Sequence, residues 1–453
     1  MLVIMTHERS IIERNPWWAS GSVPEGLIGI KRREYLGKIA ERLKDRKLLA
    51  ILGIRRSGKS TLIYQSIKYL LDNGTDPKNI FYINADDFEK PGRANLEEAL
   101  DFCQQNNMVS LKDKKLYVFI DEIQNIRGWQ QLLKKYYDLK YASKFIVSGS
   151  SSSLIYKNSS ESLAGRISFI DVFPLTFREF LQFNSIEMPE AALHFQSLKK
   201  IYFDLSPKVN EIAGFLSQYL NVGGFPEWFD VKNEEVWFKI LAEEYTSLLI
   251  YRDIVRVFSI RDPLLLESVF RFVAAHSGER FSYLGIAKQN DGDKETSKQY
   301  IFHLARSHLI NLSDYYTKSK KASERKEKKV YFCDTGLKNS IGGRQDIGFD
   351  AETSVFLHCL KHVSGHPMGK IFYWLDKKKN ETDIIMSYRS ELIAVEVKYR
   401  SSIEDTDLKG ILNFCKNFGV KNAYVVTKML MEEREIEGIR FSFIPLWLFL
   451  LVF

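Results

Sequence analysis

A short stretch near the start of this chain constrains its fold more than any other feature. Gly53–Ser60 matches the phosphate-binding pattern G-x-x-x-x-G-K-[ST] at every fixed position. The apolar run Lys47–Leu52 precedes it, and Thr61–Ile67 follows with the spacing of an amphipathic helix. This motif binds polyphosphate when it connects a strand to a helix. The sequence therefore predicts a nucleotide-binding α/β fold rather than a chance glycine-rich turn.

The same motif predicts the ligands of the loop. Gly53 and Gly58 let the backbone bend closely around a phosphate, because neither carries a Cβ atom. Backbone amides at the helix N-terminus then face the anion. In this motif the lysine, Lys59, reaches the β- and γ-phosphates, and the hydroxyl of Ser60 binds Mg²⁺. We therefore expect ATP and Mg²⁺ as cofactors, with ATP held by Gly53, Arg55, Arg56, Ser57, Gly58, Lys59, Ser60 and Thr61.

A second motif supplies carboxylates downstream of the loop. Leu116–Ile120 is an apolar run that ends in Asp121 and Glu122, as expected for a buried strand that delivers acids to the carboxyl edge of a sheet. Asp121 is expected to hold Mg²⁺, and Glu122 to orient and polarise the attacking water. Phosphoryl transfer depends mainly on positioning and charge neutralisation, so these groups can suffice. We predict Lys59 and Glu122 as catalytic residues.

Further strands predict a parallel sheet with helices on both faces. Asn79–Asn84 and Lys144–Ser150 read as strands that alternate with helical stretches. Ser148 lies at the end of its strand, where a polar side chain can contact the γ-phosphate or water, or belongs to a serine-rich loop. Arg166 precedes another apolar strand. It either stabilises transition-state charge, in cis or from a neighbouring subunit of a homo-oligomer, or is a surface arginine.

Composition limits the remaining classes of protein. A chain of 453 residues is expected to hold two or three domains. The formal net charge of +8 favours an anionic partner such as nucleic acid, unless the excess is simply spread over the surface. The apolar C-terminal segment 444–453 is too short to span a bilayer, and we expect no signal peptide at the N-terminus. The four cysteines lie far apart and none forms a C-x-x-C pair, so we expect neither disulfides nor a zinc site, as in a cytoplasmic protein. They are Cys103, Cys333, Cys359 and Cys415.

Together these motifs resemble a family of archaeal and bacterial AAA+-type P-loop ATPases. The resemblance extends over essentially the whole chain, and it is carried by Gly53–Ser60, Ile120–Gln124, Ser148–Ser151, Leu163–Arg166, Phe173–Phe180, Gly223–Glu227, Tyr251–Ile254 and Val330–Leu337. It implies an ATPase domain with an N-terminal arm over residues 1–185 and a helical and winged-helix domain over 186–340. It also implies a small α/β, nuclease-like domain over 341–453. In that family, both the winged-helix and the nuclease-like part have long been domains of unknown function.

A basic segment lies in the expected winged-helix domain. Residues 282–304 read as helix, turn, helix, and Leu309–Leu312 and Lys329–Phe332 read as two strands. Between them, Lys318–Lys329 is rich in lysine, so it resembles a wing tip that grips DNA phosphates. A solvated charge run is the alternative. We predict DNA as a partner on this basis.

The last part of the chain carries a second group of acids. Glu352 lies on an expected helix, Asp383 precedes a strand, and Glu396 and Lys398 lie on one face of the next strand. The set resembles the PD-(D/E)xK nuclease core. There, carboxylates hold Mg²⁺ and the lysine positions water. A half-exposed strand that alternates in this way without any chemistry is the alternative.

The sequence therefore favours a cytoplasmic, Mg²⁺-dependent ATPase that drives or regulates an action on DNA and has no membrane segment. A second hypothesis adds a C-terminal nuclease with its metal at Glu352, Asp383 and Glu396. The alternative from another class is an ATP-switched regulatory module that binds DNA or protein without cutting.

Overall fold

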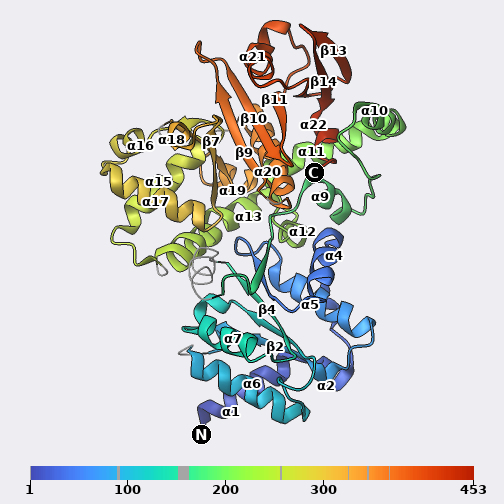
Figure 1. Cartoon of the computed structure of the whole chain (residues 1–453), viewed down its shortest axis with the longest axis vertical. Helices are drawn as coiled ribbons and strands as arrows, with labels where there is room; N and C mark the ends of the chain where they lie inside the picture. Colours follow the sequence, from blue (N-terminus) through green and yellow to red (C-terminus); the bar gives the residue numbers. More distant parts are fainter. Residues whose placement is uncertain are drawn as a thin grey trace. The chain divides into compact units, whose positions relative to one another are not determined.

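The computed structural model describes residues 2–88, 92–150, 163–255, 258–324, 326–343, 346–366 and 368–453 (Figure 1). Backbone contacts divide the chain into two compact units, Met1–Phe173 and Pro174–Phe453. Ser151 of the serine motif and Arg325 of the basic segment lie outside the described residues, as does the side chain of Lys320.

The first unit is built on a five-stranded parallel sheet of order β2-β3-β4-β1-β5. Its strands are β1 (Leu48–Leu52), β2 (Ile80–Asn84), β3 (Tyr117–Asp121), β4 (Lys144–Gly149) and β5 (Ile167–Asp171). Strands β1 to β4 are almost continuous apolar runs, as expected for parallel strands covered on both faces. The predicted α/β fold class is confirmed.

Helices cover both faces of this sheet. They are α1 (Leu2–Arg14), α2 (Trp17–Ser20), α3 (Glu25–Ile28), α4 (Arg33–Arg42), α5 (Lys59–Asp72), α6 (Arg93–Asn107) and α7 (Trp129–Asp138). Because side chains alternate along a strand, β1 feeds two separate cores. Leu48, Ala50 and Leu52 pack with side chains of α6 and α7. Leu49 and Ile51 pack with those of α4 and α5.

The second unit begins with helices and ends with a large sheet. Its α-helices are α9 (Phe177–Phe183), α10 (Phe195–Asp204), α11 (Val209–Val222), α12 (Trp228–Val231), α13 (Glu234–Lys239), α15 (Pro263–Ala275), α16 (Tyr283–Gln289), α17 (Lys294–Arg306), α18 (Lys320–Glu324), α19 (Thr335–Ser340), α20 (Ile347–Ser364), α21 (Lys409–Phe418) and α22 (Leu446–Phe449). Two π-helical segments, η5 (Ile240–Tyr245) and η6 (Leu248–Val255), precede α15.

The sheet of the second unit has nine strands in the order β13-β14-β12-β11-β10-β9-β7-β8-β6. Their bounds are β6 (Arg280–Phe281), β7 (Ile310–Tyr315), β8 (Lys328–Phe332), β9 (Lys370–Leu375), β10 (Glu381–Tyr388), β11 (Glu391–Lys398), β12 (Asn422–Thr427), β13 (Glu432–Ile436) and β14 (Ile439–Pro445). A short parallel pairing of β7 with β9 joins the strands around the basic segment to the C-terminal strands. The family resemblance implies a domain boundary after residue 340. One continuous sheet includes strands from both sides of that position.

Candidate active site

The phosphate-binding loop lies between β1 and α5, and its two fixed glycines have separate structural reasons. Gly58 is in the left-handed region, with φ of 91°, directly before the first residue of α5. A Cβ atom on Gly53 would lie 2.2 Å from the backbone oxygen of Val172, next to β5. Lys59 is buried, and its Nζ atom lies 3.0 Å from the backbone oxygens of both Gly53 and Ile54. The lysine is thus held inside the loop.

A buried arginine that the motif did not predict supports the loop. The guanidinium of Arg32 donates to the backbone oxygen of Ser57 at 2.9 Å and to that of Phe173 at 3.0 Å. It therefore ties the loop to the segment that follows β5. Arg55 and Arg56 are half-buried on the loop itself.

Asp121, at the end of β3, accepts hydrogen bonds from hydroxyl groups of two neighbouring strands and one helix. Its Oδ2 atom accepts from Ser60 Oγ at 2.6 Å and from Tyr82 OH at 2.9 Å, and its Oδ1 atom accepts from Ser148 Oγ. The predicted residues Ser60, Asp121 and Ser148 are therefore brought together at the carboxyl edge of the sheet. Tyr82, from β2, is a further member that the motifs did not predict.

Glu122 follows Asp121 in a left-handed conformation, with φ of 52°. Its carboxylate accepts hydrogen bonds from Gln124 Nε2 and, at 3.3 Å, from Ser150 Oγ. Burial would raise the pKa of Glu122, but the positive charges of Lys59 and Arg55, with these hydrogen bonds, lower it below its ordinary value. Glu122 is therefore an ionised carboxylate that can accept a proton.

The loop residues fit a polyphosphate. In the described part of the chain, the hydroxyl of Ser57 is buried without a hydrogen-bond partner. Such an orphaned polar atom costs free energy unless a ligand satisfies it. The Lys59 ammonium rests on carbonyl oxygens, which a phosphate oxygen can replace. Ser60 and Asp121 present paired oxygen atoms, the ligand type that Mg²⁺ prefers.

Arg166 lies at the opposite edge of the sheet. Its backbone oxygen accepts a hydrogen bond from the amide of Leu48, at the start of β1. The phosphate-binding loop follows the other end of β1. At 3.3 Å per residue, the two ends of this strand are about 13 Å apart. Its Nε atom pairs with Asp138 Oδ1 at 2.8 Å. Arg166 therefore lies away from the phosphate-binding loop of its own domain, and its catalytic role, in cis or in trans in a homo-oligomer, stays a prediction.

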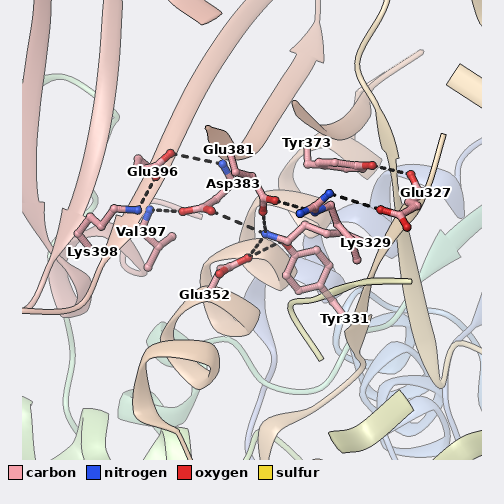
Figure 2. A network of polar contacts seen from close by, with 11 residues as sticks. Glu327, Lys329, Tyr331, Glu352, Tyr373, Glu381, Asp383, Glu396, Val397 and Lys398 are labelled. Atoms are coloured by element: carbon pink, nitrogen blue, oxygen red, sulfur yellow. Dashed lines mark hydrogen bonds and ion pairs between the residues drawn. The ribbon is translucent and has the colours of Figure 1, made fainter. Parts of the chain in front are cut away.

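In the second unit, the predicted nuclease-like residues do come together (Figure 2). Asp383 Oδ2 accepts from the backbone amide of Val397 at 2.8 Å, and the amide of Asp383 lies 3.4 Å from Glu396 Oε2. Lys398 Nζ pairs with Glu396 Oε1. Glu352, on α20, faces the same group of side chains (Figure 2). We call Glu352, Glu381, Asp383, Glu396 and Lys398 the carboxylate cluster.

Lys329 enters this cluster from β8. Its Nζ atom lies 2.6 Å from Glu352 Oε1 and 2.5 Å from Glu381 Oε1. The distance to Asp383 Oδ1 is 3.7 Å. Burial raises the pKa of Glu352 to about 7 and that of Glu396 to about 8, and the nearby charge of Asp383 acts in the same direction. These buried acids therefore depend on adjacent cations to stay ionised.

The residues of the cluster do not fit the predicted metal. Over the described ranges, no group of three or more His, Cys, Asp or Glu side chains is arranged to hold a metal ion. The Lys329 ammonium lies among the oxygen atoms that would be its ligands.

The basic segment is only partly a free tip. Lys328 pairs with Asp314, and Lys329 is buried. Lys326 is exposed and lies 5.5 Å from the centre of the Tyr315 ring. It borders an open groove of about 950 Å³ that the sequence did not predict. The groove is lined by Arg280, Tyr315, Lys326, Glu327, Tyr373, Trp374, Leu375, Asp376, Lys377, Lys378, Lys379, Asn413 and Asn417.

Comparisons with known protein families divide the chain into three parts. Residues 45–181 match the AAA domain family. Residues 214–349 match a domain of unknown function, DUF8612, and residues 347–449 match another, DUF4143. The AAA match covers the loop, both carboxylates and Arg166, so the part of the first unit that holds the candidate site is similar to AAA domains.

Relatives of similar length occur in bacteria and archaea. An uncharacterized protein of Haemophilus influenzae is 26% identical over 429 residues, which are 92% of this chain and 98% of the relative. Uncharacterized protein MJ1544 of Methanocaldococcus jannaschii is 26% identical over 389 residues, 84% of this chain and 81% of the relative.

Among solved structures, the Walker-type ATPase PABY2304 of Pyrococcus abyssi aligns with a TM-score of 0.43 and 17% identity, over 69% of this chain and 95% of that one. AMPPCP-bound DnaA from Aquifex aeolicus aligns with a TM-score of 0.26 and 16% identity, over 62% of this chain and 89% of that one.

Among the described residues, no helix combines the length and the apolar character needed to cross a bilayer.

Proposed function

We propose that this chain, in which residues 45–181 match the AAA domain family, hydrolyses ATP with Mg²⁺ to drive or regulate an action on DNA in the cytoplasm. The observation that carries the ATPase part is the convergence of Lys59, Asp121 and Glu122 at one edge of the sheet, with Glu122 ionised. The DNA part is supported separately by charged groups of the second unit.

Each residue has a defined task in the proposed reaction. Lys59, freed from the loop carbonyls, would pair with the β- and γ-phosphates. Ser60 and Asp121 would hold Mg²⁺, which neutralises phosphate charge. Glu122 would accept a hydrogen bond from the attacking water and then its proton, while Gln124 fixes the carboxylate.

Replacing Lys59 by Ala should abolish tight ATP binding, because it removes the cation that the loop holds for the phosphates. The measurement is calorimetric titration of the purified full chain with ATP and Mg²⁺. The matched control is Lys68→Ala on the same helix, where the lysine pairs with Asp72 on the surface. Equal ATP affinity in Lys59→Ala and wild type would contradict the proposed site.

The second unit supports a DNA partner through its fold order and its charge. The sequence of elements α15, β6, α16, α17, β7 and β8, with β8 paired to both β6 and β7, has the order of a winged helix. The groove beside it carries five basic side chains and two acidic ones. Of the two acids, Asp376 accepts hydrogen bonds from backbone amides of its own turn. Glu327 forms an ion pair with Arg280 at 3.4 Å. The groove therefore presents an excess of positive charge, which suits a phosphate backbone.

Serine substitutions at four groove lysines test the DNA contact. Each phosphate that a lysine neutralises releases counterions. Changing Lys326, Lys377, Lys378 and Lys379 to Ser should thus reduce the slope of log affinity against log salt by up to about four on duplex DNA. The control replaces the exposed Lys112, Lys114, Lys115 and Lys140 of the first unit and removes the same charge. Equal slopes in wild type and groove variant, measured by fluorescence anisotropy, would argue against this surface.

For the C-terminal part, the position of Lys329 favours a regulatory, non-cutting module over a nuclease. A buried ammonium that pairs with Glu352 and Glu381 competes with any metal for the same oxygen atoms. We therefore propose that the C-terminal domain serves recognition rather than metal-dependent cleavage.

A further inference from the structure

The carboxylate cluster receives a buried lysine, Lys329, from a strand that does not itself carry any of the acids. The carboxylate cluster is formed by α20, β10 and β11, whereas Lys329 comes from β8, which precedes α20 and pairs with β6 and β7. Figure 2 shows the lysine pointing into the cluster between Glu352, Glu381 and Asp383. Its side chain is only 2% exposed. A buried ammonium is costly unless it is fully paired, so this position is specified by the carboxylates around it.

Two acids of the cluster, Glu352 and Glu381, accept from further donors of the protein besides Lys329. Tyr331 OH donates to Glu352 Oε1 at 2.8 Å, the same atom that pairs with Lys329. Arg280 Nε lies 3.1 Å from Glu381 Oε2, on the far side from Lys329.

The two remaining acids are held in the same way. The amide of Val397 donates to Asp383 Oδ2 at 2.8 Å, and Lys398 pairs with Glu396. Each acid of the cluster therefore has a positive or hydrogen-bonding partner supplied by the chain itself.

We propose that the Lys329 ammonium is a built-in replacement for a divalent cation, so that the C-terminal module holds no metal and cuts no phosphodiester by a metal-dependent route. A divalent ion bound to Glu352 Oε1 at about 2.0–2.6 Å would lie within about 5 Å of Nζ. Two positive charges at that distance in a buried site repel strongly. A metal at these oxygen atoms would therefore have to displace the Lys329 ammonium.

Removal of the lysine charge is the direct test. The nucleotide-free full chain is titrated with Mn²⁺, and free Mn²⁺ is followed by electron paramagnetic resonance. Wild type should hold no Mn²⁺ at the cluster. Lys329→Met should gain about one bound Mn²⁺ per chain, since Met keeps the length of the side chain but leaves the acids without their cation. Lys329→Met combined with Asp383→Asn should lose it again.

A matched variant separates the cluster from a general charge effect. Lys328→Met removes the adjacent positive charge, which pairs with Asp314 outside the cluster, and should gain no Mn²⁺. The wild-type chain decides the proposal even if Lys329→Met does not fold, because Mn²⁺ bound by wild type and lost in Asp383→Asn would overturn it. A folded Lys329→Met chain that binds no more Mn²⁺ than wild type would overturn it as well. Since these chains contain no nucleotide, either result leaves the proposed ATPase function to its own test.

Discussion

Replacing Glu122 by Gln is expected to lower the steady-state rate of ATP hydrolysis by about 100-fold or more, while ATP still binds. The amide keeps the shape of the side chain and the contacts with Gln124 and Ser150, but it cannot accept the proton of the attacking water. Lys59 and Asp121 are unchanged, so the phosphates and Mg²⁺ are held as before. The variant should therefore accumulate as an ATP-bound complex.

The measurement is a comparison of ATP binding with single- and multiple-turnover hydrolysis for the two chains. Glu97→Gln is the matched control, because Glu97 is a half-buried acid on α6 that pairs with Arg93 on the surface. Single-turnover rates are needed, since slow product release would otherwise hide the chemical step. Wild-type hydrolysis by the Glu122→Gln chain would remove Glu122 from the catalytic role.

In the first unit, the sequence predicted the residues that act through local geometry. Gly53–Ser60 is a short segment whose spacing predicts its role, and Asp121–Glu122 is predicted from an apolar run that lies downstream of it. The structure brings Ser60 and Asp121 to 2.6 Å. Tyr82 could not be predicted, because its contact depends on β2 lying beside β3. Strand order is a property of the whole sheet and leaves no local pattern.

In the second unit, the sequence predicted Glu352, Asp383 and Glu396 as a group, but it did not predict that Lys329 pairs with acids of this group. Alternation along a strand places Lys328 and Lys329 on opposite faces. Lys328 is half-exposed and Lys329 is buried, although in the sequence both belong to one basic run. The side of β8 that carries Lys329 is decided by long-range strand pairing, including the contact of β7 with β9. A count of charges along the chain therefore assigned a buried counter-ion to an exposed wing tip.

Two glycine-containing motifs of the family resemblance, Gly223–Glu227 and Val330–Leu337, contact each other in the second unit. Neither motif has a proposed role in binding a ligand. Gly223 has φ of 80°, and the amide of Gly224 donates to the buried carboxylate of Asp334 at 2.6 Å. A Cβ atom on Gly336, in α19, would lie 2.0 Å from the backbone oxygen of Val222, at the end of α11. These glycines therefore allow two helices to approach at backbone contact.

Replacing Gly336 by Ala should consequently destabilise the second unit by about 3 kcal/mol, the upper end of the usual cost of overpacking, because backbone atoms cannot move aside as a flexible side chain can. The matched control is Gly214→Ala in α11, where a Cβ atom would meet nothing within 4 Å. There the lower conformational freedom of Ala should leave stability unchanged or raise it by up to about 1 kcal/mol. Urea unfolding of both chains, followed by tryptophan fluorescence, gives the comparison, and ATP binding reports separately on the first unit. Equal stability in the two variants would mean that α11 and α19 can separate at little cost, and the glycines would then need a reason other than close packing.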